Sequence, residues 1–447
     1  MKTVLIFAYE CAPFNRSGAT IGAQRPAQFA KHLPKFGWNA IVLCCDVNSR
    51  WQISIEEAKQ TIPNLVKKKL QNFDRAGSII IPIPSIRYSD WVDNLWMRSI
   101  DIDSESGNIK LKPGTINRIT TKVSTFFKLF SGDYSASWIA PAKIATIEIL
   151  KTVQLEACIA EHSPDASLFL SRWLNQKYKI PWIIDFRDQI LMNLPKIIWP
   201  LYNHFLRRYF KTVSATIAVN RHLAAMDEKI FRKPFFVIPN GYDLEEFKDL
   251  SHSSSPADTF FRIVYTGNIL YRDQLKPFFE ALQMLVKERP NLRLRFVYRG
   301  MAKETILNYS SQFGISQWMD IKGIIPRSQA LQLLKGADLL LLLSASPDEQ
   351  SVFFSKGVQP GKAFEYLAAG KPILCTPGDE GLLDELIQET CAGVIISNPK
   401  RLSSYLFEVY EKWEQKKDIP YKPRKEVIKN YSRENLARKL ADILNQQ

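Results

Sequence analysis

The sequence predicts an α/β protein built from two doubly wound parallel-sheet domains. Short, continuous apolar runs of strand length alternate with segments of helical period along most of the chain, and this alternation restarts after a small polar stretch near residue 255. The length of 447 residues also favours more than one domain, because a domain usually holds about 100 to 200 residues. Each half is long enough to bury a core of its own.

The first half opens with a strand–helix–strand unit. Residues 4–9 (VLIFAY) and 39–45 (NAIVLCC) are continuous apolar runs, as in strands covered on both faces, and residues 24–37 carry apolar side chains at helical spacing. The pattern weakens over about 49–139, which we interpret as an insertion in this domain. The alternation then resumes and predicts a parallel sheet. Its elements are helices over 142–155 and 165–178 and strands at 156–161 and 181–186.

The domain boundary is expected between about residues 250 and 258. The stretch 235–247 (FFVIPNGYDLEEF) ends a strand with a proline and an Asn-Gly turn, and 251–258 (SHSSSPAD) has the composition of a linker. This division gives an N-terminal domain over 1–250 and a C-terminal domain over 258–430. Six strands separated by helices are expected in the second domain, at 261–267, 292–300, 319–324, 337–344, 371–376 and 392–397.

The C-terminal tail, 431–447, reads as an amphipathic helix behind a serine at the N-cap position, and it could pack back on the N-terminal domain. Two doubly wound domains joined by one linker are expected to face each other across a cleft. Ligands bind such sheets in the crevice at the carboxyl ends of the strands.

Composition narrows the class of partner and the compartment. A net charge of +15 and a pI near 9.4 point to an acidic partner. Because the sequence has no zinc-finger spacing, no RNP-type motif and no distinct basic recognition helix, we favour lipid and phosphate over nucleic acid as that partner. Six scattered cysteines form no CxxC pair, which suits a reducing compartment. Neither a signal peptide nor an apolar window of spanning length is recognisable, so we expect a cytoplasmic protein, at most peripheral on the inner face of a membrane.

Five stretches, taken in order, resemble one family. They are the N-terminal strand with its Gly loop and RPAQFAKHLPKFGW, then IPWIIDFRD, VIPNGYDLEEF, RIVYTGNIL and PGKAFEYLAAGKPIL. Together they are similar to the GT-B, family-4-like glycosyltransferases of bacterial surface-polysaccharide pathways such as lipopolysaccharide synthesis. The resemblance covers most of the chain outside 49–139. It implies a GT-B fold and transfer of a sugar from a nucleotide-diphosphate sugar to a glycan or lipid-linked acceptor, with retention of anomeric configuration.

The strongest motif, PGKAFEYLAAGKPIL (360–374), predicts the nucleotide-sugar site. A Pro-Gly loop runs into a helix whose first N–H groups, from Gly361 onward, can hold a diphosphate. Lys362 adds a cation there, and Glu365 can accept from both ribose hydroxyls; the resemblance implies the same role for Glu365. The alternative is that Lys362 and Glu365 are solvated helix residues.

A second part of the donor site is expected after the strand at 261–267. Gly267 lets the backbone approach a phosphate, and Asn268 stands where many relatives carry an arginine. Arg272 is the first candidate for the positive charge that would contact the pyrophosphate, and Arg299 is the second. For each of them, the equally supported alternative is an ordinary surface arginine. The family's Glu-x7-Glu pattern also lacks its first carboxylate here, because that position is Gly357. Lys356 or Gln359 could occupy that space.

In the first domain, three stretches supply acceptor-side candidates. The loop 13–26 carries Gly22 and Arg25, and the resemblance implies that it closes over acceptor and donor phosphates; a plain βα loop is the alternative. The strand 181–186 is followed by Arg187 and Asp188, which we assign to an acceptor phosphate and to the proton of the acceptor hydroxyl. The alternative, which the sequence supports nearly as well, is that an Asp–Arg pair among Asp185, Arg187 and Asp188 only fixes the loop. His162 is a minor candidate.

The sequence suggests neither a metal nor a cofactor beyond the donor. Asp101 and Asp103 spell a DxD, but they lie in the irregular insertion, so we expect metal-independent transfer. Two basic stretches, 64–73 and 118–130, could rest on an anionic membrane surface or could be solvated faces of core helices. The rival functions are a catalytically degenerate GT-B scaffold that binds nucleotide or lipid, and a UDP-sugar epimerase.

Overall fold

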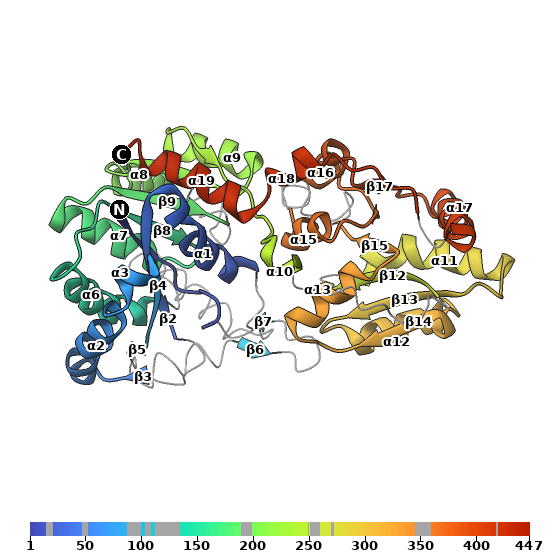
Figure 1. Cartoon of the computed structure of the whole chain (residues 1–447), viewed down its shortest axis with the longest axis horizontal. Helices are drawn as coiled ribbons and strands as arrows, with labels where there is room; N and C mark the ends of the chain where they lie inside the picture. Colours follow the sequence, from blue (N-terminus) through green and yellow to red (C-terminus); the bar gives the residue numbers. More distant parts are fainter. Residues whose placement is uncertain are drawn as a thin grey trace. The chain divides into compact units, whose positions relative to one another are not determined.

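The structure is a computed structural model in which the chain forms two compact units (Figure 1). Unit 1 comprises Met1–Ile102, Ile109–Pro239 and Arg433–Gln447, and unit 2 comprises Asn240–Ser432. The structure describes residues 1–14, 21–46, 52–86, 100–102, 109–111, 135–188, 199–248, 250, 260–269, 272–344, 359–416 and 419–447. Among these residues, no helix is both long enough and apolar enough to cross a membrane.

Unit 1 is built on a seven-stranded sheet in the order β11-β10-β9-β8-β1-β2-β4, with every pairing parallel. Because parallel neighbours need a crossover, helices separate most of these strands in sequence. The strands are β1 (Lys2–Phe7), β2 (Trp38–Cys45), β4 (Ser78–Ile83), β8 (Ala157–His162), β9 (Trp182–Phe186), β10 (Ala215–Ala218) and β11 (Phe236–Val237). Short strands β3 (Gln52–Ile53) and β5 (Ser85–Ile86) pair with each other, as do β6 (Ile100–Ile102) and β7 (Ile109–Leu111).

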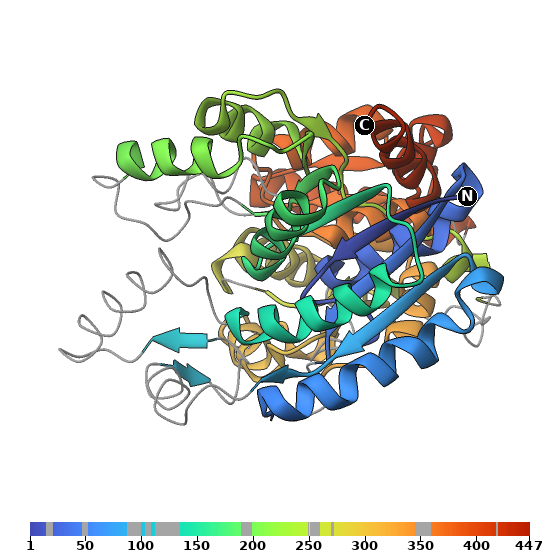
Figure 2. The same ribbon diagram turned by 90° about the vertical axis from the view of Figure 1, so that its left-hand side faces the viewer.

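Helices cover both faces of this sheet, as its apolar strands require. Figure 2 shows α2 and α6 running side by side on one face. Helix α2 begins behind Ser54, whose hydroxyl accepts the N–H of Glu57 at 3.1 Å. The helices of unit 1 are α1 (Ile21–His32), α2 (Ile55–Leu70), α3 (Phe73–Ala76), α6 (Ala136–Leu150), α7 (Ala166–Tyr178), α8 (Trp199–Tyr209), α9 (Arg221–Phe231) and α19 (Arg433–Leu444), with a 3₁₀ turn, η1 (Leu33–Phe36).

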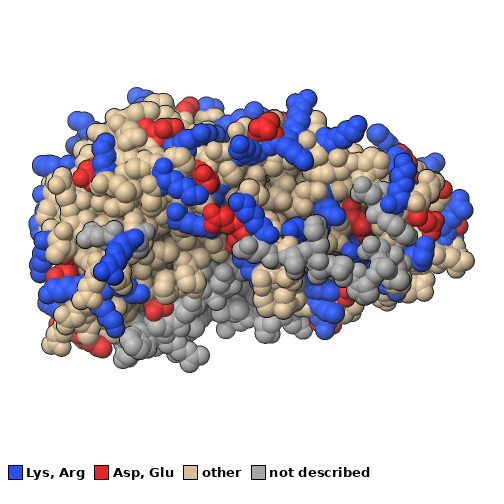
Figure 3. Space-filling view, viewed as in Figure 1, with Lys and Arg blue, Asp and Glu red and all other residues tan. Residues whose placement is uncertain are grey.

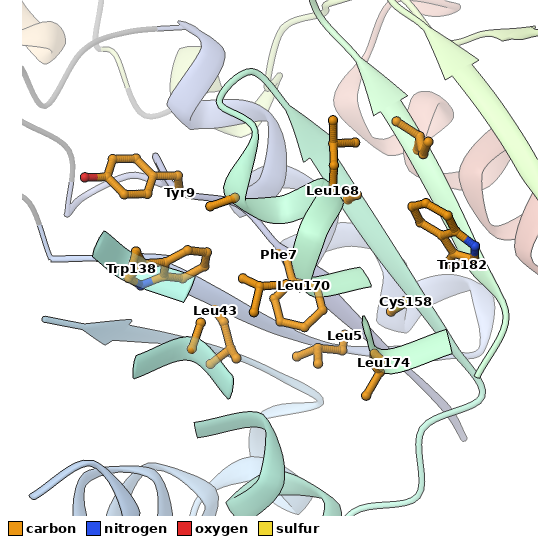
Figure 4. Packing of buried hydrophobic residues seen from close by; sticks show 14 of the residues in the cluster. Leu5, Phe7, Tyr9, Leu43, Trp138, Cys158, Leu168, Leu170, Leu174 and Trp182 are labelled. Atoms are coloured by element: carbon orange, nitrogen blue, oxygen red, sulfur yellow. The ribbon is translucent and has the colours of Figure 1, made fainter. Parts of the chain in front are cut away.

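Side chains alternate between two hydrophobic cores along β1. Leu5 and Phe7 point into one core, where Figure 4 shows them packed with Leu43, Leu170 and Leu174. Val4 and Ile6 point into the second core, on the opposite face. The alternation is the period of two of any strand, and here both faces are apolar.

The C-terminal helix α19 belongs to unit 1. Its buried residues Leu436 and Leu440 lie in the second core, and α19 packs along α1. Two polar contacts fix its ends, Lys35 Nζ to Glu434 Oε2 at 2.7 Å and Trp38 Nε1 to Asn445 Oδ1 at 3.0 Å.

Unit 2 has a six-stranded parallel sheet in the order β14-β13-β12-β15-β16-β17. Its strands are β12 (Phe261–Thr266), β13 (Leu294–Arg299), β14 (Met319–Lys322), β15 (Leu339–Leu342), β16 (Ile373–Cys375) and β17 (Gly393–Ile395). Two separate hydrophobic cores again lie on its two faces. The helices are α10 (Glu245–Lys248), α11 (Lys276–Glu288), α12 (Lys303–Gln312), α13 (Arg327–Lys335), α15 (Gly361–Ala369), α16 (Leu382–Thr390), α17 (Pro399–Lys416) and α18 (Lys425–Lys429), with 3₁₀ turns η3 (Arg272–Leu275) and η4 (Ser316–Trp318).

The predicted α/β class with two parallel sheets is confirmed, but two boundaries differ from expectation. The units divide between Pro239 and Asn240 rather than near residue 255, because Tyr242 and Phe247 pack in a core of unit 2. Within the expected insertion, β4 pairs with β2 along the main sheet, so this part belongs to the body of unit 1. Pro82 is tolerated in β4 because β4 is an edge strand.

Candidate functional site

In unit 2, the start of helix α15 contacts the loop that follows strand β12. The Nζ atom of Lys362 donates to the hydroxyl of Tyr265 and to the main-chain oxygen of Asn268, the latter at 3.2 Å, and lies 4.0 Å from the centroid of the Tyr265 ring. The structure thus brings Gly267, Asn268, Gly361 and Lys362 to one place, as the sequence predicts.

Gly267 has a backbone conformation that suits glycine, with φ of +102°. A Cβ atom built on this residue would lie 3.3 Å from Nζ of Lys362, so a side chain there would crowd the ammonium group. Glycine therefore keeps the space beside the lysine open.

Lys362 is a half-buried cation whose described hydrogen-bond acceptors are uncharged. Burial lowers the pKa of Lys362 to about 7, and the carboxylate of Glu365 opposes this shift only in part. A bound anion would favour the charged form of this lysine. The site can therefore hold a phosphate through Lys362 and through the first N–H groups of α15.

Glu365 lies one turn further along α15 and pairs with Arg327. The Nη1 atom of Arg327 is 2.6 Å from Oε1 of Glu365, and the same guanidinium makes two contacts with Glu246, at 2.9 and 2.8 Å. Neither Arg327 nor Glu246 was expected from the sequence. One signal was present: Arg327 is the first residue of α13, where the helix dipole disfavours a cation unless a carboxylate compensates it.

Two further arginines, Arg299 and Arg272, were predicted for the donor site, and the structure describes the side chain of only the first. Arg299 ends β13 with its guanidinium held by Asp320, through the carboxylate at 2.7 Å and the main-chain oxygen at 2.8 Å. Its charge is already compensated within the sheet. Arg272 opens the turn η3, but the placement of its side chain lies outside the described part of the chain, as do Lys356 and Gly357.

In unit 1, charged side chains gather at the carboxyl ends of β8 and β9. Arg187 follows β9, and its Nε atom lies 2.9 Å from Oε1 of the buried Glu161, while Nη2 donates to the main-chain oxygen of Ser163. A Cβ atom on Gly22 would collide with Nη1 of Arg187. The predicted residues Gly22 and Arg187 therefore meet, and a side chain at position 22 would displace the guanidinium of Arg187.

Glu161 was missed by sequence reasoning because it ends an apolar strand-like run. Burial raises the pKa of Glu161 to about 8, Arg187 and Arg25 oppose the shift, and the nearby carboxylate of Asp185 adds to it. With this pKa, the carboxyl group of Glu161 changes from its neutral to its charged form as the pH rises through about 8. A buried acid beside an arginine at a sheet edge is typical of functional sites.

Arg25 has a structural role rather than the expected contact with phosphates. Its side chain is 0% exposed, it makes a bidentate pair with Asp185 at 2.7 and 2.9 Å, and it donates to the main-chain oxygens of Ile238 and Pro239. These contacts tie α1 to β9 and to the segment after β11. Asp185 is occupied by the same pair.

His162 and Asp188 also lie at this edge of the sheet. His162 is buried against Phe186, and its Nε2 atom is 3.0 Å from Oδ1 of Asp165. Asp188 is exposed just after β9. Arg187, with its small exposed fraction of 15%, and Asp188 are therefore the candidates on this edge that a ligand could reach.

No group of three or more His, Cys, Asp or Glu side chains within the described ranges is arranged to hold a metal ion. All six cysteines are free thiols, and five of them are buried. Of the DxD letters, Asp101 lies in β6 and Asp103 falls outside the described residues.

Known proteins are similar to part of this chain in sequence and to the chain as a whole in fold. A family model described as glycosyl transferases group 1 matches residues 247–426. An uncharacterised glycosyltransferase of Methanocaldococcus jannaschii, MJ1607, is 22% identical over 201 residues, which is 44% of this chain and 48% of that protein. The chain thus matches about half the length of this curated relative.

Solved structures match over the whole chain. The N-terminal domain of trehalose-6-phosphate phosphatase from Candida albicans has a TM-score of 0.60 at 11% identity, covering 100% of this chain and 97% of that one. The Anabaena protein HepE, crystallised with UDP and glucose, has a TM-score of 0.55 at 12% identity, covering 100% of both chains. A glycosyltransferase from Rickettsia africae has a TM-score of 0.54 at 15% identity, covering 100% of this chain and 98% of that one.

At these identities the structural similarity is one of fold. The family match, in contrast, falls on unit 2 and includes α15 with Gly361, Lys362 and Glu365. The similarity to the family model described as glycosyl transferases group 1 covers residues 247–426, and the fold of the chain is that of GT-B glycosyltransferases.

Proposed function

We propose that the protein is a glycosyltransferase that moves a sugar from a nucleotide-diphosphate sugar to an acceptor hydroxyl. The observation that carries the proposal is the meeting of Lys362 with Asn268, which joins the start of α15 to the loop after β12 inside the family-matched region. A helix N-terminus, a glycine-lined backbone and a cation together form a site for a diphosphate.

In unit 2, the diphosphate would contact the N–H groups from Gly361 onward, the ammonium of Lys362 and the backbone at Gly267. Glu365 would accept from the ribose hydroxyls through Oε2, while Arg327 keeps Oε1 in place. Arg272 is the proposed second cation, with Arg299 less suited because Asp320 already pairs with it.

In unit 1, Arg187 and Asp188 would contact the acceptor. During transfer the acceptor oxygen bonds to the anomeric carbon, the bond from that carbon to the departing phosphate oxygen breaks, and the acceptor proton passes to the leaving phosphate or to Asp188. Positive groups near the leaving diphosphate stabilise its developing charge. We propose retention of configuration, as the family resemblance implies, and no metal requirement, because the DxD letters at Asp101 and Asp103 lie in the irregular insertion.

The biological setting is proposed in the same way. We place the reaction in cell-surface polysaccharide synthesis, with a glycan or lipid-linked acceptor, in the cytoplasm or on the inner face of the membrane. The free thiols of all six cysteines suit a reducing compartment.

Calorimetric titration with UDP, GDP, ADP and TDP, and with their common sugars, tests the donor site without added metal. UDP is the first probe, because the structure of the similar Anabaena protein contains it. We expect one nucleotide to bind, and Glu365→Ala to weaken it by about 1.5 to 3 kcal/mol, the value of a charge-assisted hydrogen bond. Glu411→Ala, an exposed change on α17, is the matched control.

The transfer itself is tested by following release of the nucleoside diphosphate from the bound donor in the presence of acceptor extracts. If no nucleotide binds, or if Glu365→Ala binds as tightly as wild type, the donor site is wrong. Tight binding without release of the diphosphate would instead indicate a nucleotide-binding scaffold.

A further inference from the structure

Helix α8 exposes two large apolar side chains on one face. Leu201 is 74% exposed and Phe205 is 47% exposed. Residues 201, 204, 205 and 208 are spaced at i, i+3, i+4 and i+7, so they share one side of the helix. His204 and Arg208, the other members of this set, are also exposed. We call these four residues the outer face of α8.

The opposite side of α8 already holds the helix on unit 1. Leu206 is 1% exposed and lies in the core of unit 1 with Phe210, while Tyr209 packs against the same core. Phe205 contacts the ring of Tyr209, with 5.6 Å between the ring centroids, yet it and Leu201 keep a large exposed surface beyond this packing. Figure 2 shows α8, in bright green, at the margin of unit 1.

Basic side chains border this outer face. The C-terminal ends of α8 and α9 lie together, since Nε of Arg207 donates to the main-chain oxygen of Ile230 at 2.7 Å and Lys233 donates to that of Val213 at 2.8 Å. This contact gathers several Lys and Arg residues beside the helix. They are Arg207, Arg208, Lys211, Lys229, Arg232 and Lys233.

Acidic residues do little to offset this charge. Between residues 199 and 237 the chain has seven Lys or Arg and two acidic residues, Asp227 and Glu228. Asp227 is fully buried. Figure 3 shows the wider pattern, in which Lys and Arg outnumber Asp and Glu on the visible face of the molecule.

The basic stretch 64–73, which the sequence offered as a membrane-binding segment, lacks this combination. It falls mainly in α2, whose apolar residues Ala58, Ile62 and Val66 are buried in the core. Its lysines are therefore a solvated face without exposed apolar neighbours. The other stretch, 118–130, lies outside the described residues.

We propose that the outer face of α8, with the basic residues at its C-terminal end, docks unit 1 on an anionic lipid bilayer. Leu201 and Phe205 would enter the boundary between headgroups and acyl chains, and Arg208 and Lys211 would contact lipid phosphates. Exposed apolar residues combined with Lys and Arg on one helix are the requirements for such interfacial binding. This surface is independent of the donor site, so each proposal can fail alone.

Vesicle co-sedimentation of the full chain tests the proposal. Vesicles of phosphatidylcholine alone are compared with vesicles that also contain phosphatidylserine, at low and at high salt. We expect binding to the anionic vesicles that weakens with salt, because Lys and Arg contacts are screened. The double variant Leu201→Ser/Phe205→Ser should bind at least about ten-fold more weakly, since two interfacial apolar side chains are lost.

Matched controls come from unit 2. Ile324 is 72% exposed and Met284 is 41% exposed, so Ile324→Ser/Met284→Ser removes similar exposed apolar surface and should bind vesicles as wild type does. Arg208→Glu/Lys211→Glu should remove the preference for anionic vesicles, whereas Lys322→Glu/Lys400→Glu, at two exposed positions, should affect it much less.

Thermal unfolding checks that all four variants remain folded, as expected for exposed positions. Equal binding to neutral and anionic vesicles would overturn the proposal, and so would equal loss in the α8 and control variants. If sedimentation velocity shows a dimer that Leu201→Ser/Phe205→Ser dissociates, the face binds a second copy of the chain, and the lipid proposal is wrong.

Discussion

The Nζ atom of Lys362 lies 3.2 Å from the main-chain oxygen of Asn268, a residue 94 positions earlier in the chain. This contact places a cation with uncharged partners beside the backbone at Gly267, where a diphosphate is proposed to bind. Because the ammonium is half-buried and no described carboxylate bonds to it, its protonation should respond to a bound anion.

Nucleotide affinity should therefore fall as pH rises above about 7. Burial lowers the pKa of Lys362 to about 7 in the unliganded protein, and a bound diphosphate raises it, so binding takes up a proton. Titrations between about pH 7 and 9, in buffers of different ionisation enthalpy, should reveal this uptake and a loss of up to about ten-fold in affinity per pH unit.

The variant Lys362→Arg isolates this effect, since arginine stays charged throughout the range. Its affinity for the nucleotide should be nearly independent of pH above about 7. A slope as steep as that of wild type would show that another group takes up the proton.

The stability of the unliganded protein should change in the opposite sense over the same range. The unfolded lysine titrates near 10.4 and the folded one at about 7, so between these values the unfolded state binds more protons. The contribution of Lys362 to the free energy of unfolding therefore rises with pH above about 7. Denaturant titrations should show that Lys362→Met removes this component of the slope.

Arg327 should stabilise unit 2 through its two carboxylate partners. Replacement by methionine leaves Glu246 and Glu365 without their shared cation, and their partial exposure moderates the cost. We expect the free energy of unfolding to fall by about 1 to 3 kcal/mol in denaturant titrations.

The conservative variant Arg327→Lys should recover only part of this stability, because lysine cannot contact both carboxylates with a planar fork. If Arg327→Met unfolds at the same denaturant concentration as wild type, the three-residue network adds nothing to stability.

Structural features that depend only on neighbouring residues in the sequence were predictable. The continuous apolar runs gave the strands of both sheets, because a strand covered on both faces needs no polar residues. The motif at 360–374 gave the start of α15 with Lys362 and Glu365, since a loop, a helix start and one helical turn are all local.

Features set by distant contacts were not predictable. Arg327 meets Glu365 over 38 positions and Glu246 over 81, and no periodicity encodes such pairs. Glu161 ends an apolar run and shows its importance only once Arg187 folds beside it. Polar composition suggested a boundary near residue 255, whereas the packing of Tyr242 and Phe247 in unit 2 determined where the units divide.

Gly22→Ala should slow sugar transfer without weakening the binding of the nucleotide. A Cβ atom at this position collides with Nη1 of Arg187, so the guanidinium must shift from its position beside Glu161. We expect turnover to fall at least about ten-fold, as for other misplaced positioning groups, while calorimetry shows unchanged nucleotide binding in unit 2.

Gly323→Ala is the matched control, because a Cβ atom there meets nothing within 4 Å. It should keep wild-type turnover. Equal activity of the two alanine variants would mean that the position of Arg187 does not matter for the reaction.

Glu161→Gln should change how stability depends on pH. Burial raises the pKa of Glu161 to about 8, above the value near 4.3 of an unfolded glutamate. Between these values the folded state binds more protons than the unfolded state, so the contribution of Glu161 to the free energy of unfolding falls as pH rises towards about 8. The neutral glutamine has no such contribution, so denaturant titrations should show the variant gaining stability relative to wild type on going from pH 6 to pH 8. A constant difference between the two proteins across this range would mean that Arg187 keeps Glu161 ionised, and the acid would then act as a fixed counter-charge that orients the guanidinium.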